Sequence, residues 1–329
     1  MKRLLTSTLA VASLVAAVSL SSAANGATTK KAATKRRIAP TTTTATAIAS
    51  VTTEEAKPKP TLRIGSIPDQ DPAKIQRGFG LVAKFLESKL GQKVEFVPVA
   101  DYTAAVTAFR VGDLDLVWFG GLSGVQAQKQ VKDAIYVAQR DIDPKFRSVF
   151  IAGTDQRLPA INRVADLIFL KGLSMTFGSE NSTSGRTMPQ FFLDQAGLEL
   201  SDFKGAVGYS GSHDKTIRLV ESGAYEAGAL NKAVWDSNVA AKTVNLDKVK
   251  VVFTTPTFFD YHWLARPDTD TKFGSGTAAK LRAAFLGVNK TSAEGKDVLD
   301  FFGAESFIET KNENYKDIER IAKRLGLIS

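Results

Sequence analysis

The sequence predicts an α/β protein with two lobes, and three observations lead to this prediction. A chain of 329 residues is too long for one ordinary hydrophobic core. From Thr61 onward, short apolar runs alternate with helical patterns, which is typical of parallel sheets with right-handed crossovers. Extended apolar segments near 147–153 and 252–264 predict two connections between the lobes, as in a hinged binding protein.

Composition excludes several kinds of site. The sequence has no cysteine, which rules out disulfides, thiolate metal sites and a cysteine-linked lipid anchor. Only two histidines are present, His213 and His262, which argues against a zinc enzyme. We therefore expect no cofactor and no metal.

The N-terminus has the features of an export signal. Lys2 and Arg3 precede an apolar run at 9–20, and small residues at 21–24 suit cleavage. An uncleaved anchor is the alternative, but a run of about twelve residues is short for a membrane span. We expect a signal peptide at 1–24 and an exported, soluble periplasmic protein without a lipid anchor.

Residues 25–60 are rich in Thr, Ala, Lys and Pro and predict a disordered linker. Most of the positive charge lies in the N-terminal part: residues 1–60 hold nine Lys or Arg against two Glu, whereas the whole chain is +9. The remainder is nearly neutral and has no basic stripe, so nucleic acid is not an expected partner.

Strand and helix signals alternate through residues 61–130. Helices are expected from Pro72, ending at Gly91, and from the N-cap Asp101, ending at Gly112. Ligands of such sheets bind beyond the carboxyl ends of the strands. The residues expected at those ends include Tyr102, Phe119 and Gly120.

The lobe boundaries follow from the two connections. Lobe 1 is expected at 61–150 with a C-terminal return at 256–329, and lobe 2 at 151–255. The return is expected to be mostly helical, with helices at 277–286, 296–302 and 314–325.

A hydroxyl-rich turn at 178–189 is the main candidate binding element. It follows a strand-like run at 173–177 and precedes an apolar helical pattern. Unpaired N–H groups at a helix start favour an anion, and hydroxyls add donors. The residues concerned are Ser182, Thr183, Ser184 and Gly185. The structural alternative is an ordinary capped helix without a ligand.

A second turn, Ser210-Gly211-Ser212-His213-Asp214, opens another helix. Together with Ser182-Thr183-Ser184-Gly185, Asp101-Tyr102, Leu116-Val117-Trp118-Phe119-Gly120 and Asp260-Tyr261-His262-Trp263, it resembles the periplasmic substrate-binding components of phosphonate, phosphite and phosphate ABC transporters. The resemblance covers about 61–329. It implies a type II periplasmic-binding-protein fold, with each lobe a mainly parallel sheet flanked by helices and two hinge crossings.

The resemblance also implies a function and a site. The protein is expected to capture a phosphorus oxyanion between its lobes and deliver it, as a monomer, to an ABC permease in the inner membrane. The implied oxyanion contacts are Tyr102, Ser182, Thr183, Ser184, His213 and Asp260. Phe119 stands where related binders have tyrosine, so one hydroxyl contact is missing and the ligand's substituent stays open.

Each of these residues also has a structural explanation. Tyr102 could pack its ring under a strand, His213 could cap a helix, and Asp260 could pair with hinge backbone. Asp214 is expected to stabilise the N-terminus of its own helix. Trp118 and Trp263 are expected in the core.

Two other functional classes stay open. A phosphoester hydrolase could use His213 with a serine nucleophile, oriented by Asp260. The sequence has no GxSxG elbow or two-metal carboxylate cluster to support it. A ligand-sensing or adhesion protein could use the same fold without a transporter. For the oxyanion binder, His213 and helix-end amides are expected to favour negative charge, and Asp260 to require a protonated ligand.

Overall fold

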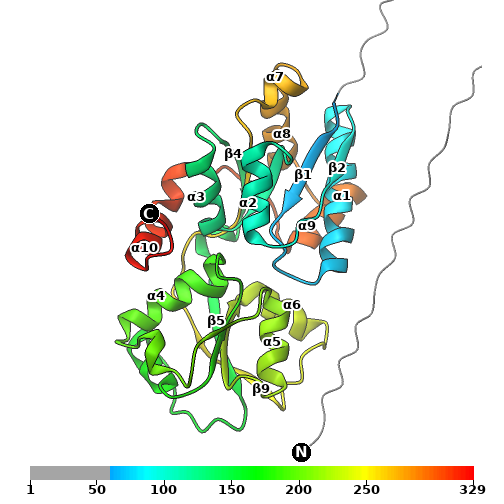
Figure 1. The fold of residues 1–329 in the computed structure, drawn as a ribbon. Coiled ribbons are helices and arrows are strands. Elements are labelled where there is room, and N and C mark those ends of the chain that lie inside the picture. The colour runs from blue at the N-terminus through cyan, green and yellow to red at the C-terminus, as the bar shows by residue number, and fades with distance from the viewer. Residues whose placement is uncertain (1–59) are drawn as a thin grey trace, which may run out of the picture. The chain divides into compact units, whose positions relative to one another are not determined.

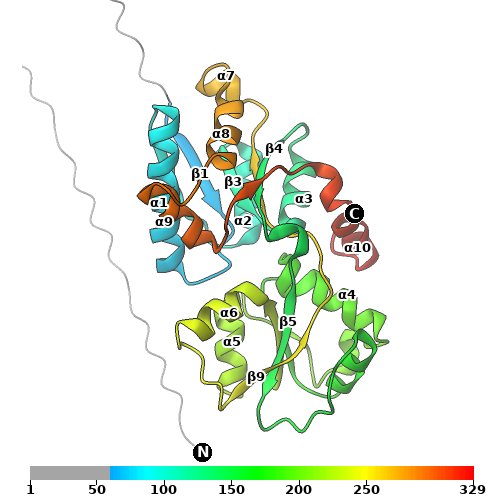
Figure 2. The same cartoon turned by 180° about the vertical axis from the view of Figure 1, so that it is seen from behind.

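The computed structural model describes residues 60–329; the predicted signal peptide and almost all of the predicted linker lie outside them. Two sheets organise the described residues, and the two lobes around them lie one above the other in Figures 1 and 2. We define lobe 1 by its six-stranded sheet, of order β11-β4-β10-β3-β1-β2, and lobe 2 by its five-stranded sheet, of order β7-β6-β8-β5-β9.

The strands of lobe 1 come from both ends of the described chain. They are β1 (Leu62–Ser66), β2 (Val94–Phe96), β3 (Leu116–Phe119), β4 (Ile135–Arg140), β10 (His262–Ala265) and β11 (Phe307–Ile308). Strands β1, β2 and β3 are parallel, whereas β10 pairs antiparallel with β3 and β4. Strand β10 runs the other way because it brings the chain back from lobe 2.

Helices cover both faces of the lobe 1 sheet (Figures 1 and 2). One group comprises α1 (Pro72–Leu90), α8 (Thr277–Leu286) and α9 (Ala293–Phe302). The other comprises α2 (Tyr102–Val111), α3 (Gly121–Gln130) and α10 (Lys316–Arg324). Shorter helices are η1 (Asp143–Lys145), α7 (Thr269–Phe273) and η5 (Asn312–Tyr315).

Helix ends in lobe 1 follow the sequence signals. The Asp71 carboxylate accepts hydrogen bonds from the N–H groups of Ala73 and Lys74 at the start of α1, and Gly91 ends that helix with φ of 61°. Helix α2 is capped by Asp101 and ends at Gly112 in the same way. These boundaries are therefore confirmed.

Lobe 2 has a smaller sheet. Its strands are β5 (Ser148–Gly153), β6 (Met175–Phe177), β7 (Gly208–Tyr209), β8 (Ala227–Asn231) and β9 (Val249–Thr254). The helical segments are η2 (Val164–Leu170), η3 (Thr183–Thr187), α4 (Met188–Gln195), η4 (Leu200–Asp202), α5 (His213–Glu221) and α6 (Lys232–Ala240). Strand β6 is parallel to β7 and β8, and β5 is antiparallel to β8 and β9.

The α/β two-lobed fold is thus confirmed, with one correction. Both sheets are mixed rather than mainly parallel, because β10 and β11 in lobe 1 and β5 in lobe 2 run opposite to the other strands of their sheets. Strand β5 begins at Ser148, three residues before the lobe boundary expected at 151.

The two connections between the lobes pair with each other. The first joins β4 to β5, and the second joins β9 to β10. The N–H of Phe146 donates to the carbonyl of Phe258 at 2.9 Å, and the reverse bond is 3.0 Å long. Paired crossings of this kind confine motion to bending about one short segment.

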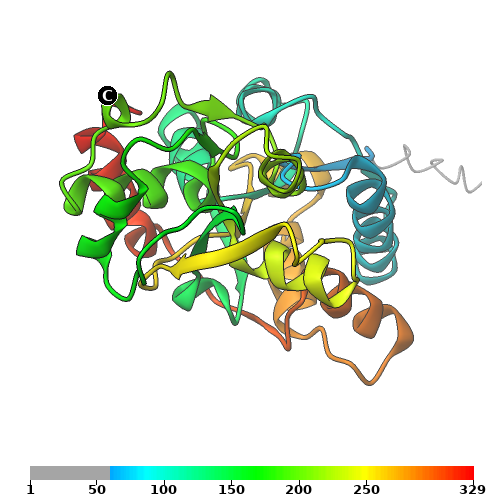
Figure 3. The same cartoon turned by 90° about the horizontal axis from the view of Figure 1, so that it is seen from below.

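Aromatic side chains fill the core of lobe 1. Trp118 and Trp263 are both buried there, as expected, with ring centroids 5.4 Å apart. The C-terminal helix α10 lies beside α4 of lobe 2 (Figure 3), where Arg324 pairs with Asp194. Across residues 60–329, no helix has the length and apolar character needed to cross a membrane.

Candidate functional site

The predicted site residues lie where the lobes meet. Lobe 1 contributes the N-termini of α2 and α3, and lobe 2 contributes η3 and the N-terminus of α5. The second interlobe connection contributes Asp260. The lobes are in contact across this region, since the Leu122 N–H donates to the Thr183 hydroxyl at 2.8 Å.

The turn after β6 starts its helix earlier than the sequence suggests. Residues Thr183–Thr187 form a π-helical turn before α4, a feature often found at functional sites. The Ser182 hydroxyl accepts the Gly185 N–H at 2.9 Å and so caps this turn. The capped-helix explanation therefore holds for Ser182, whose hydroxyl proton is still available to a ligand.

Ser184 has the hydroxyl best suited to a ligand. It is buried and has no hydrogen-bond partner among residues 60–329, whereas its carbonyl accepts the Ser148 hydroxyl at 2.6 Å. A buried hydroxyl without a partner is costly, so its retention points to an additional group at this site.

Tyr102 and Asp260 present two more such atoms. Within the described chain, the Tyr102 hydroxyl and Asp260 Oδ2 are also buried without partners. Burial raises the pKa of Tyr102 well above its ordinary value, so the phenol stays a neutral donor. Burial raises the pKa of Asp260 to about 7, while the Gly121 N–H acts in the opposite direction. The Ser184 and Thr183 hydroxyls also lower this pKa because they lie close to the carboxylate, although neither is in hydrogen-bond geometry with it.

Two glycines allow this close packing. A Cβ on Gly185 would lie 2.9 Å from Ser182 Oγ and 3.0 Å from His213 Cε1. A Cβ on Gly120 would lie 3.3 Å from Asp260 Oδ1. Side chains at either position would fill the space between the polar groups.

His213 is neutral. Its ring is fully buried, and burial lowers its pKa to about 3. Nδ1 accepts the Asn231 N–H at 3.3 Å, which assigns the proton to Nε2. His213 can therefore act on a negative ligand as a neutral hydrogen-bond donor.

Phe119 contributes no side chain to this region. Its ring is fully buried and packs edge-on against Phe109, with centroids 5.6 Å apart. Gly120, directly after it, is the N-cap of α3. At this position, the strand end therefore places backbone rather than a side chain near Asp260.

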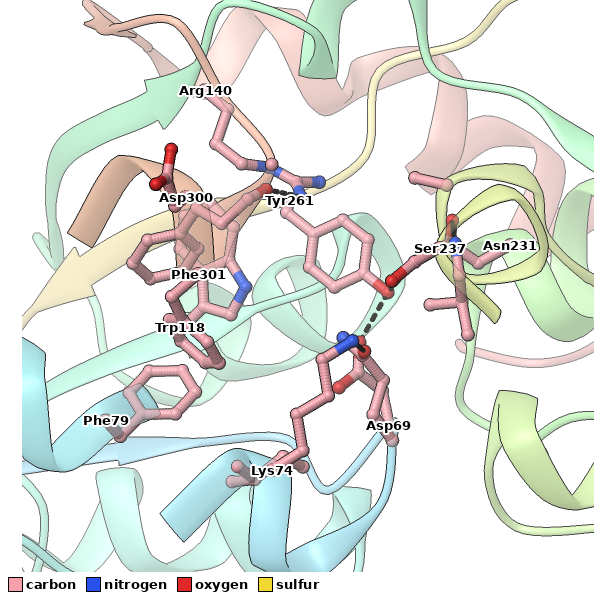
Figure 4. A pocket seen from close by; sticks show the side chains of 16 residues that line it. Asp69, Lys74, Phe79, Trp118, Arg140, Asn231, Ser237, Tyr261, Asp300 and Phe301 are labelled. Carbon is pink, nitrogen blue, oxygen red and sulfur yellow. Dashed lines mark hydrogen bonds between the residues drawn. The ribbon is translucent and has the colours of Figure 1, made fainter. Parts of the chain in front are cut away.

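A buried network next to His213 was not expected from the sequence (Figure 4). The Tyr261 hydroxyl donates to Asp69 Oδ2 at 2.7 Å and accepts Asn231 Nδ2–H at 3.1 Å. His213 Nε2 lies 3.5 Å from the same hydroxyl. Burial raises the pKa of Asp69 to about 6. Their positions at strand ends could have indicated these residues, since Asp69 follows the end of β1 and Asn231 ends β8.

A cavity of about 180 Å³ adjoins this network (Figure 4). Asp69, Asn231 and Tyr261 line it, together with Lys74 and Ser237. None of the predicted ligand-binding residues does. We assign the candidate site to the unpartnered polar groups rather than to this cavity. No group of three or more acidic or histidine side chains within residues 60–329 is arranged to hold a metal ion.

Two lobes with paired crossings, meeting around buried polar groups, define the class of hinged solute-binding proteins. Comparison with known proteins specifies the family. Residues 64–315 match the family described as "ABC transporter, phosphonate, periplasmic substrate-binding protein". The chain belongs to this family, and it is therefore the substrate-binding component of an ABC transporter, which works with a permease, and not an enzyme.

Individual relatives agree with this assignment. The chain is 47% identical to the probable ABC transporter phosphite binding protein PhnD1 of Prochlorococcus marinus over 268 residues, 81% of this chain and 90% of that one. The structure of PhnD1 with methylphosphonate superposes with a TM-score of 0.80 at 46% identity, covering 82% of this chain and 99% of that one. The phosphonates-binding periplasmic protein of Escherichia coli is 26% identical, covering 72% of this chain and 68% of that one.

Proposed function

We propose that this protein binds a singly protonated phosphorus oxyanion, namely phosphite, a phosphonate or phosphate, between its lobes. The observation that carries the proposal is the set of three buried, unpartnered polar atoms on Tyr102, Ser184 and Asp260. Two are hydroxyl donors and one is a carboxylate acceptor. A tetrahedral oxyanion that still carries one proton has both acceptor oxygens and a donor O–H to match them.

The surrounding residues suit such a ligand. The Ser182 and Thr183 hydroxyls are further donors, and Gly120 and Gly185 leave room for the ligand oxygens. His213 Nε2–H makes only a long contact of 3.5 Å with the Tyr261 hydroxyl, which leaves it available as a donor. The N-termini of α2, α3 and α5 add positive potential without a cationic side chain.

The Asp260 carboxylate is the group that makes the ligand's proton necessary. Its Oδ1 is held by the Gly121 N–H, which leaves Oδ2 for the ligand. An unprotonated oxyanion would face this carboxylate without a proton between them, and an unpaired buried charge is costly.

Relatives support the ligand class. Their names specify phosphite, phosphonates and, for the Mycolicibacterium smegmatis protein, phosphate import. We further propose that the chain is exported through the signal at 1–24 and acts as a soluble periplasmic monomer, without a lipid anchor, that delivers the oxyanion to the permease.

Calorimetric titration of the purified protein with phosphite, methylphosphonate and phosphate tests the proposal. We expect at least one of the three to bind with a Kd in the micromolar range or below. The absence of binding by all three at millimolar concentration would contradict it.

A further inference from the structure

Among the side chains that join the lobes, two stand directly beside proposed ligand contacts in the sequence. The first is Asp214, in the first turn of α5. Its Oδ2 accepts the N–H of Asp71, the N-cap residue of α1 in lobe 1, at 2.8 Å. Asn238 of α6 donates to Oδ1 at 2.9 Å and so orients the carboxylate. The aspartate expected to serve only its own helix therefore also reaches across to the other lobe.

The second is Asn181, directly before Ser182. Its Nδ2 donates to Thr103 Oγ1 of α2 at 3.0 Å. Its Oδ1 accepts a hydrogen bond from Gln126 Nε2 of α3, also at 3.0 Å. Both ends of one amide thus bind lobe 1, although Asn181 itself belongs to lobe 2.

We propose that Asn181 and Asp214 are closure residues, which position the ligand-binding turns by stabilising the closed arrangement of the lobes. Asn181 precedes Ser182, and Asp214 follows His213, so each turn carries a ligand contact and an interlobe contact side by side. These interlobe bonds form only when the lobes meet. A contribution confined to the closed state raises the affinity for every ligand that requires closure, by the same factor.

The position of Asn181 separates closure from folding. Its side-chain bonds all lead to the other lobe, and it is only partly buried, so water replaces them when the lobes separate. Asp214 is buried and also lies at the N-terminus of α5, where a carboxylate stabilises the helix. Asn181 therefore gives the cleaner test.

The inference rests on the proposed cleft site and is tested by a double-mutant cycle across the lobes. Asn181→Ala, Gln126→Ala and the double variant are titrated with phosphite and methylphosphonate, and dissociation rates are measured by stopped flow. Gln130→Ala is the matched control, since Gln130 is an exposed glutamine of the same helix for which no interlobe bond is found within the described chain.

We expect each single variant to weaken both ligands by the same factor, about three- to tenfold, through faster dissociation. The double variant should be no weaker than Asn181→Ala, because that single change already removes the bond to Gln126 as well as the bond to Thr103. The ligand-free melting temperature should be unchanged, and Gln130→Ala should match the native protein. Asp214→Ala should weaken both ligands by a larger common factor, because its bond involves a charge. It should also lower the ligand-free melting temperature, because it removes the carboxylate at the N-terminus of α5.

Three results would overturn the inference. Native affinity in Asn181→Ala would show that the bond adds nothing to closure. A changed ratio between the two ligands would place Asn181 in ligand selection instead. A lower ligand-free melting temperature with an additive double variant would assign it a role in folding. If the native protein bound neither of these ligands nor phosphate, the proposed function itself would fail.

Discussion

The carboxylate of Asp260 accepts a hydrogen bond from the N–H of Gly121 at 2.9 Å, which links the second interlobe connection to the N-terminus of α3. One oxygen is therefore anchored on a helix end, while the other is buried without a partner within the described part of the chain. Asp260 directly precedes Tyr261, and β10 begins one residue later. Bending of the connection would therefore move Asp260 together with Tyr261 and its buried network. Ligand binding and lobe closure are thus expected to be coupled at this residue.

Removing the Ser184 hydroxyl should weaken binding without weakening the fold. A hydrogen bond to a charged group contributes about 1.5–3 kcal/mol, so Ser184→Ala should raise the Kd for phosphite at least about tenfold. The ligand-free melting temperature should be unchanged or slightly higher, because the buried hydroxyl has no partner within residues 60–329. Calorimetry and thermal denaturation measure the two effects.

Ser201→Ala is the control for this variant, since Ser201 is exposed and lies in η4, which contributes no residue to the proposed site. It should behave as the native protein in both measurements. Native affinity in Ser184→Ala together with a reduced melting temperature would show that Ser184 serves the fold alone.

His213 should remain neutral in the closed protein. Its pKa is lowered to about 3 by burial, so closure favours the unprotonated ring. The stability that the closed protein gains by keeping this ring neutral is complete above the ordinary pKa of 6.5 and is lost as the pH falls toward 3. We expect NMR of the phosphite-bound protein to show no titration of His213 between pH 8 and pH 5.

The assignment is simple because the chain has only two histidines, and His262→Gln leaves one signal. His262 should be neutral as well, since burial also lowers its pKa to about 3. A His213 signal that titrates at pH 6.5 or above would show that the ring binds the oxyanion as a cation.

Ligand should also change the shape of the molecule in solution. The paired connections at Phe146 and Phe258 form a hinge, and the interlobe bonds of Asn181 and Asp214 describe a closed arrangement. Saturating phosphite should reduce the radius of gyration in small-angle scattering and raise the melting temperature. Superimposable scattering curves with and without ligand would exclude hinge closure as the binding step.

Local signals allowed much of the fold to be predicted. The N-caps Asp71 and Asp101 and the glycines Gly91 and Gly112 act within a few residues of their own helices, so the boundaries of α1 and α2 follow from the sequence. The mixed character of the sheets could not be predicted from the sequence, because the direction of a strand depends on which lobe the chain returns from. Strand β4 was missed; it ends in the buried polar pair Gln139 and Arg140.

Part of the candidate site could also be predicted from local signals in the sequence. Ser182 to Gly185 form a recognisable local motif, and Tyr102 follows an evident cap. The network of Tyr261, Asp69 and Asn231 could not be predicted from spacing, because Tyr261 and Asp69 are 192 residues apart in sequence. The bridging roles of Asn181 and Asp214 likewise depend on how the two lobes meet.

The central claim is that Asp260 requires a proton on the ligand, and competition between phosphite and sulfate at pH 7 tests it most directly. Sulfate carries no proton, so Asp260 must take one from water, whereas an aspartate exposed to water has an ordinary pKa of 3.8. The difference of about three units between pH 7 and this pKa corresponds to a roughly thousandfold loss of affinity for sulfate. Calorimetry should therefore show phosphite bound about a thousandfold more tightly than sulfate, and Asp260→Asn, whose amide can donate to sulfate, should lose most of this difference. Equal affinities in the native protein, or the full preference retained in Asp260→Asn, would contradict the claim.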